Sequence, residues 1–111
     1  MFEQIPNCEL RVADMPPAEA QWHEIESFAF TYWAYDYHGG FDAVGELANA
    51  AGAAYAEDGT LPDTLAELRT CLFFEQRRYH HFGWSPEGHA MEYIRALLEA
   101  IRGKVAVGEW D

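Results

Sequence analysis

Residues 85–103, SPEGHAMEYIRALLEAIRG, form the most complete helix pattern in the chain. Ser85 suits the N-cap, Pro86 is tolerated in the first turn, and Gly103 follows the last periodic position. Apolar residues recur every three or four positions, which predicts one buried stripe. They are Met91, Ile94, Leu97, Leu98 and Ile101. The stretch therefore predicts an amphipathic helix that belongs to the core.

A second helix is predicted upstream, after a break at Gly39 and Gly40. Apolar residues at helical spacing predict that it ends near Gly59. They are Phe41, Val44, Leu47, Ala48, Ala51 and Tyr55. Gly45 and Gly52 lie at the edge of this stripe. Because glycine has no side chain, we expect a neighbouring backbone to approach closely there.

A third helix is predicted to begin in the sequence TLPD and to run to about His81. Thr60 and Asp63 have the spacing of a capping box, and Pro62 is tolerated in a first turn. The stripe expected to face the core consists of Leu65, Leu68, Leu72 and Tyr79.

A helix is also predicted nearer the N-terminus, with Pro17 at its first position. Trp22, Ile25 and Ala29 follow at helical spacing. Residues 28–37, FAFTYWAYDY, are rich in aromatic side chains, and this composition suits a strand equally well. Helix and strand both remain open for that segment.

The predicted fold is mainly α, a single domain over residues 1–111 built as a bundle of about four helices. A chain of 111 residues has the size of one domain. The alternative is an α+β fold with a small sheet of two or three strands. Its strands would come from residues 8–12, 28–37 and 104–107.

The charge is strongly negative and unevenly distributed. The chain has 19 acidic residues, seven lysines and arginines, and a net charge of -12. Residues 1–60 hold eleven of the acids and one base, Arg11. Such a field opposes binding to nucleic acid or anionic membranes and attracts basic partners.

The sequence predicts a cytoplasmic protein with free thiols. Its first residues lack the basic start and apolar run of a secretory signal, and no window approaches the roughly 18 apolar residues of a membrane span. Cys8 and Cys71 form no CxxC pair, which argues against a zinc knuckle or a thioredoxin-like site.

Residues 73–84, FFEQRRYHHFGW, gather aromatic and basic side chains at the end of the third predicted helix. Helical geometry places Arg77 and His81 on one face with Phe74. Positive charge near a helix C-terminus is also favoured by the helix dipole, so the cluster has a structural explanation. The functional alternative is a contact or ligand site.

Glu75 borders the apolar stripe of this helix, where a carboxylate is costly to bury unless it is paired. Arg78, one turn on, is within reach as a structural partner. The alternative is a general acid or base with a raised pKa. The pocket predicted for a small enzyme or ligand-binding domain therefore consists of Glu75, Arg77, His80 and His81.

We expect no metal, cofactor or catalytic residue. The sequence lacks HExxH, a di-iron ExxH pair, a calcium loop and both Gly-rich nucleotide fingerprints. Ser27 and Ser85 lie in no nucleophile elbow. If a metal site existed, we would expect it at Asp36, His38 and either His80 or His81.

In size, charge and aromatic content, the chain resembles the small acidic immunity and antitoxin-type proteins of bacteria. The likeness rests on composition, with no motif, so it assigns no residues. It implies a non-catalytic binding protein that blocks a basic partner, such as a toxin or a nucleic-acid enzyme.

Acidic residues would speed the encounter with that partner and aromatic residues would prolong it. The residues predicted to bind it are Trp33, Tyr35, Asp36, Tyr37, Asp42 and Glu46. The alternatives are the small enzyme or ligand-binding domain described above and a homodimeric scaffold that buries surplus aromatic surface.

Overall fold

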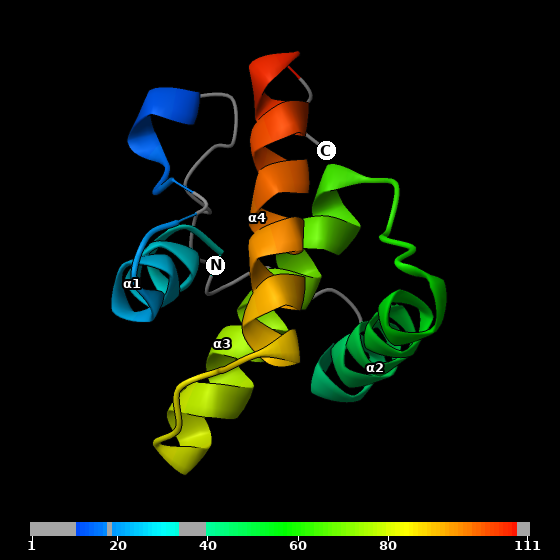
Figure 1. Ribbon diagram of the computed structural model, residues 1–111. Coiled ribbons are helices and arrows are strands. Elements are labelled where there is room, and N and C mark those ends of the chain that lie inside the picture. Colours follow the sequence, from blue (N-terminus) through cyan, green and yellow to red (C-terminus); the bar gives the residue numbers. More distant parts are fainter. Residues whose placement is uncertain (1–10, 18, 34–39, 109–111) are drawn as a thin grey trace.

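The computed structural model is a bundle of four helices, α1 to α4, preceded by a short 3₁₀ helix, η2 (Figure 1). It describes residues 11–17, 19–33 and 40–108, and side chains for residues 11–17, 19–29 and 45–108. The helices are α1 (Trp22–Trp33), α2 (Gly40–Asp58), α3 (Leu65–Phe82) and α4 (His89–Ala106), and η2 spans Val12–Asp14. The predicted mainly α fold is confirmed.

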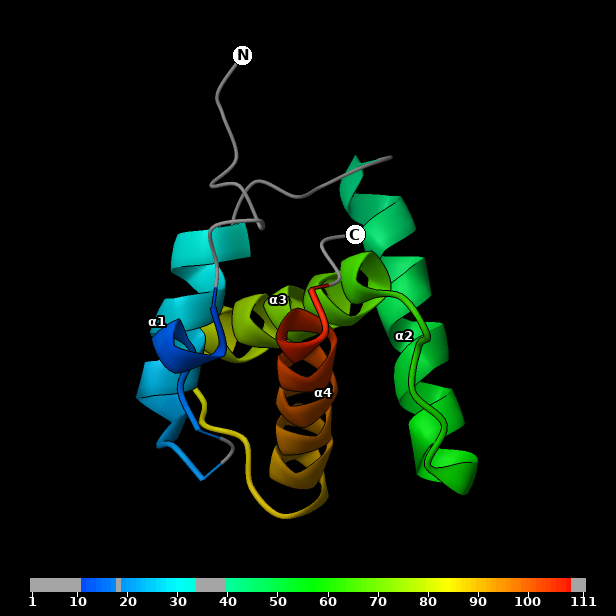
Figure 2. The same cartoon turned by 90° about the horizontal axis from the view of Figure 1, so that it is seen from above.

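Helix α3 lies at the centre of the bundle and contacts α1, α2 and α4. Figure 2 shows α1 and α2 on opposite sides of α3, with α4 crossing it between them. The stripe predicted for α4 supplies much of the core: Ile94, Leu97, Leu98 and Ile101 are fully buried. They meet Leu65, Leu68 and Leu72 of α3 and Ile25 of α1 in one apolar cluster.

The predicted start of α3 is wrong by several residues. The N-cap is Thr64, whose hydroxyl oxygen accepts a hydrogen bond from the backbone N–H of Glu67 at 3.1 Å. Thr60 instead donates its backbone N–H, at 3.1 Å, and its side-chain hydroxyl to the Asp58 carboxylate. The Thr60 hydroxyl is thus used in the turn that follows α2. It does not cap α3, which begins one turn later.

Helix α4 begins later and ends later than predicted. Gly88, with φ of 57°, precedes the helix, so Ser85 and Pro86 belong to the connection from α3. The helix continues through Gly103 because Val105, one turn after Ile101, is buried on the same face. Burial of Val105 thus outweighs the stop signal that glycine gives in a helix.

Helix α1 also begins later than predicted, at Trp22. The carbonyl of Pro17 accepts a hydrogen bond from the N–H of Ala20 in a separate turn. Residues 28–33 are helical, residues 104–106 belong to α4, and no strand occurs among the described residues. The alternative sheet is therefore not needed, although residues 8–10 and 34–37 lie outside that description.

The segment after η2 is attached to the end of α4. The Arg102 guanidinium donates hydrogen bonds to the carbonyl oxygens of Pro16, at 2.9 Å, and Met15, at 3.4 Å. The Met15 side chain is buried in the core. In the part of the chain that the structure describes, no helix is long and apolar enough to cross a membrane.

Helix α2 meets α3 largely through small residues. Among its described side chains only that of Ala48 is buried. A Cβ added at Gly45 would lie 3.6 Å from the Phe74 ring, and one added at Gly52 would meet nothing within 4 Å. The close backbone approach predicted at these glycines is therefore not found, and Gly52 faces open space.

Replacing Leu72 with alanine tests whether α3 is the centre of the core. Leu72 is fully buried, so Leu72→Ala should lower the free energy of unfolding by about 2–5 kcal/mol. Val107→Ala is the matched control because that side chain is 77% exposed, and it should change stability by less than about 0.5 kcal/mol. Urea denaturation measures both, and equal effects would contradict this packing.

Candidate functional site

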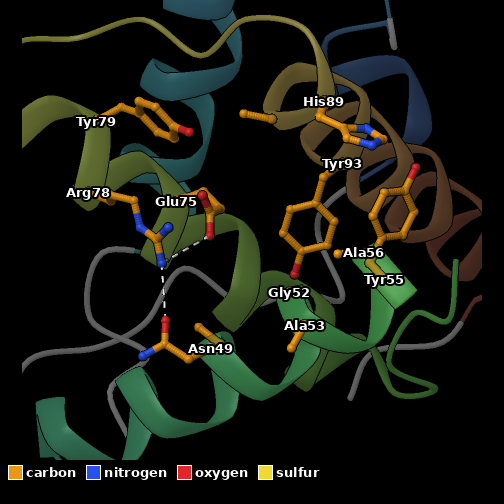
Figure 3. Close-up of a pocket in the computed structure, with 12 residues that line it drawn as sticks. Asn49, Gly52, Ala53, Tyr55, Ala56, Glu75, Arg78, Tyr79, His89 and Tyr93 are labelled. Carbon is orange, nitrogen blue, oxygen red and sulfur yellow. Dashed lines mark hydrogen bonds and ion pairs between the residues drawn. The ribbon is translucent and has the colours of Figure 1, made fainter. Parts of the chain in front are cut away.

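A pocket of about 320 Å³ lies between α2, α3 and α4, and the buried carboxylate of Glu75 forms part of its wall (Figure 3). Glu75 is 5% exposed and is the one buried acid among the described side chains. The pocket lining comprises Ala48, Asn49, Gly52, Ala53, Tyr55, Ala56, Glu75, Arg78, Tyr79, His89, Ala90 and Tyr93. Helix α2 contributes most of the small residues, whereas α3 and α4 contribute most of the ionisable side chains.

Arg78 lies at the edge of this pocket and links α3 to α2. A terminal nitrogen of its guanidinium donates a hydrogen bond to the Asn49 side-chain oxygen at 3.1 Å. The same nitrogen lies 3.7 Å from an oxygen of Glu75, one turn earlier on α3. The guanidinium carbon is also 5.4 Å from the centre of the Phe74 ring. The predicted pairing of Glu75 with Arg78 is therefore present, although the pair is long.

Three tyrosines line the pocket together with Glu75: Tyr55, Tyr79 and Tyr93 (Figure 3). The rings of Tyr55 and Tyr93 are 5.0 Å apart and tilted by 41°. Tyr79 is held from the other side by an edge-on contact with Trp22 of α1, at 6.0 Å. Burial raises the pKa of both Tyr79 and Tyr93, so these hydroxyls stay protonated at neutral pH.

Burial also raises the pKa of one carboxyl group and one thiol near the pocket. It raises the pKa of Glu75 more than the attraction of Arg78 lowers it. Cys71, one turn before Glu75, is fully buried, and burial raises the pKa of its thiol to about 11. A thiol with that pKa is protonated at neutral pH and is a poor nucleophile.

A second hollow, of about 500 Å³, lies on the outer side of Arg78. It is lined by Asn49, Phe74, Arg77, Arg78, His81 and Phe82. Next to it, the exposed rings of Phe82 and Trp84 stack at 4.9 Å, and His81 meets Phe82 edge-on at 5.0 Å. The outer hollow and the Glu75 pocket share Arg78 and Asn49, whereas Phe74, Arg77, His81 and Phe82 line the outer hollow alone.

The four residues predicted for a pocket do not share one site. Glu75 lines the pocket between α2, α3 and α4, whereas Arg77 and His81 line the outer hollow. His80 lines neither, and its Nδ1 lies 3.3 Å from the carboxylate of Glu26 on α1. Successive residues of a helix point about 100° apart, which explains the separation.

Most of the predicted partner surface lies outside the described side chains. Glu46 is exposed on α2. Trp33 is the last residue of α1, and Asp42 lies in the first turn of α2, but their side chains are not described. The remaining three, Tyr35, Asp36 and Tyr37, fall outside the described residues altogether.

Four residues that complete the Glu75 pocket were not predicted as site residues from the sequence: Asn49, Tyr55, His89 and Tyr93. They come from α2 and α4, so their meeting with Glu75 depends on how the helices cross. The only available signal was Gly52, a glycine at the edge of an apolar stripe. We expected a backbone contact there, and the structure has a pocket wall instead.

No group of three potential metal ligands occurs among the described residues. The hypothetical site at Asp36 and His38 lies outside them. No protein-family model, curated protein or solved structure matches the chain. The function must therefore be argued from the geometry of the Glu75 pocket and from the charge of the surface.

Glu75→Gln should make stability less dependent on pH. Because the folded state raises the pKa of Glu75, it favours the protonated acid, and stability falls as pH rises from the ordinary value of 4.5 through the raised value. Glutamine resembles the protonated acid and lacks this loss. The variant should therefore gain stability relative to the native protein as the pH rises above about 4.5, the ordinary pKa of glutamate.

Urea denaturation at several pH values measures this difference. Glu57→Gln is the control because that side chain is exposed on α2. Its curve should run parallel to that of the native protein. A parallel curve for Glu75→Gln would mean that the Glu75 carboxylate is hydrated in the folded protein.

Proposed function

We propose that the protein is a small-molecule-binding domain whose ligand occupies the pocket between α2, α3 and α4. The observation that carries this proposal is the buried carboxylate of Glu75 in the wall of an open pocket. Placing a carboxylate in an apolar environment is costly unless it has a strong partner. Its partner Arg78 is 3.7 Å away, so the cost is only partly offset within the protein.

The rest of the pocket supports the same proposal. Its volume of about 320 Å³ lies at the lower end of the range for ligand sites, roughly 300–1,000 Å³. Such sites combine an apolar lining with a few polar groups that fix orientation. Here alanines, Gly52 and tyrosine rings supply the lining, and Glu75, Arg78 and Asn49 supply the polar groups.

We propose binding without a chemical reaction. Glu75 has the raised pKa of a general acid or base, but the thiol nearest to it on α3, Cys71, is buried and protonated. The hydroxyls of Tyr79 and Tyr93 are protonated as well. These groups suit hydrogen bonding to a bound ligand better than attack on it.

Gly52→Leu tests the pocket without removing any polar group. The new side chain would enter the open space that Gly52 faces, and leucine favours a helix by up to about 1 kcal/mol over glycine. The variant should fold at least as stably as the native protein. It should also lose binding of any fragment found by NMR titration of the native protein.

Gly103→Leu is the matched control, because Gly103 lies in α4, is exposed and also has open space around it. It should keep the binding of the same fragment. Fragments that bind Gly52→Leu and Gly103→Leu equally would place the ligand elsewhere, and a screen with no fragment bound in the pocket would contradict the proposed function.

The second candidate function is binding of a basic protein partner, such as a toxin or a nucleic-acid enzyme. The observation that favours it is the placement of the charge. Ten of the thirteen acids with described side chains are exposed: Asp14, Glu19, Glu24, Glu46, Glu57, Asp58, Asp63, Glu87, Glu92 and Glu99. A surface of this kind raises the rate of encounter with basic proteins.

Charge reversal tests this second function on a partner recovered by pull-down at low and moderate salt. Replacing Asp36, Asp42 and Glu46 together with lysine should slow association with that partner at low salt by at least about tenfold. The control places lysine at Glu87, Glu92 and Glu99, which carry the same charge in the C-terminal half. Equal association rates for the two triple variants would contradict the predicted surface. If no partner is recovered and light scattering shows a dimer, the homodimeric scaffold is favoured.

A further inference from the structure

We infer that the pocket between α2, α3 and α4 selects an organic cation, in which an ammonium group is attached to a small apolar body. This inference rests on the proposed function, because it names the ligand class for the same pocket. It is carried by the joint placement of Glu75, the three tyrosine rings and the small residues of α2. Glu75 and the tyrosine rings suit the ammonium group, and the small residues suit the apolar body.

The Glu75 carboxylate matches the charged group. Charge-assisted hydrogen bonds from nitrogen to carboxylate are about 2.7–2.9 Å long. The Arg78 nitrogen lies 3.7 Å from the Glu75 oxygen, beyond that range. A ligand ammonium in the pocket can approach the carboxylate more closely and donate hydrogen bonds to it.

Arg78 can stay in place when such a ligand binds. It already donates a hydrogen bond to Asn49 at 3.1 Å, and its guanidinium packs near the Phe74 ring. Its side chain is also 41% exposed, so its charge is partly hydrated. The arginine therefore keeps stabilising contacts while Glu75 turns to a closer cation.

The tyrosine rings also favour a cation. Tyr55, Tyr79 and Tyr93 line the pocket that Glu75 enters, and Tyr55 and Tyr93 lie side by side (Figure 3). The faces of aromatic rings attract cations, by about 0.5–1 kcal/mol at exposed sites and more where water is excluded. An anion gains nothing from these faces.

The wall formed by α2 matches the apolar body of the ligand. It consists of Ala48, Gly52, Ala53 and Ala56, and Ala90 of α4 adds to it. These side chains offer no charge and leave space for an alkyl chain or one aromatic ring. The net charge of -12 further raises the concentration of cations near the surface and lowers that of anions.

Three probes of nearly the same shape separate charge from shape: benzylamine, benzyl alcohol and benzoate. At pH 7.5 they are a cation, a neutral molecule and an anion. NMR titration of the labelled full chain measures their affinity, in about 0.15 M salt to screen the acidic surface. We expect benzylamine to bind at least about tenfold more tightly than benzyl alcohol, and benzoate to bind most weakly.

Glu75→Gln identifies the source of that preference, with Glu57→Gln as the exposed control on α2. The first variant should lose at least about tenfold in affinity for benzylamine and keep its affinity for benzyl alcohol. The control should behave as the native protein. Equal losses in both variants would assign benzylamine to the acidic surface and overturn the inference.

The failure of this inference and the failure of the proposed function give different results. Benzyl alcohol or benzoate binding as tightly as benzylamine, with all binding lost in Gly52→Leu, would overturn the cation class and keep the pocket as a ligand site. No probe bound, together with a fragment screen that finds nothing in the pocket, would overturn both.

Discussion

The central position of α3 is the constraint on which the other features depend. A helix that contacts three others must bury most of its circumference, whereas a surface helix buries only one stripe. The apolar stripe of α3 covers part of that circumference, and the polar residues Arg69, Glu75 and Gln76 are buried as well. The buried carboxylate in the pocket is therefore a consequence of the topology of the bundle.

The acidic surface and Glu75, the one buried acid among the described side chains, are coupled electrostatically. Exposed carboxylates are hydrated and individually cost little, but together they give the protein a negative field. That field disfavours ionisation of a further acid and favours the entry of positive charge. The proposed cation site and the proposed surface for basic proteins thus depend on the same charge distribution.

The sequence predicted the helices better than their ends, and the Glu75–Arg78 pair better than the pocket around it. The apolar stripe of α4 was correctly identified because periodic burial is written along one segment. The capping signals at Thr60 and Ser85 misled because short polar side chains also stabilise turns. Glu75 and Arg78 are three residues apart on one helix, so local geometry brings them together. Tyr55, Asn49 and Tyr93 reach them only through the crossing of three helices.

The small-residue contact of α2 has a consequence for how the bundle opens. Because its described side chains bury little apolar area, residues 45–58 contribute less packing energy than equal lengths of α3 or α4. Helix α2 should therefore detach as a separate unit at a lower free energy than global unfolding requires. A molecule bound between α2 and Glu75 should stabilise α2 against this local unfolding. It should slow amide hydrogen exchange in α2 and leave exchange in α1 almost unchanged.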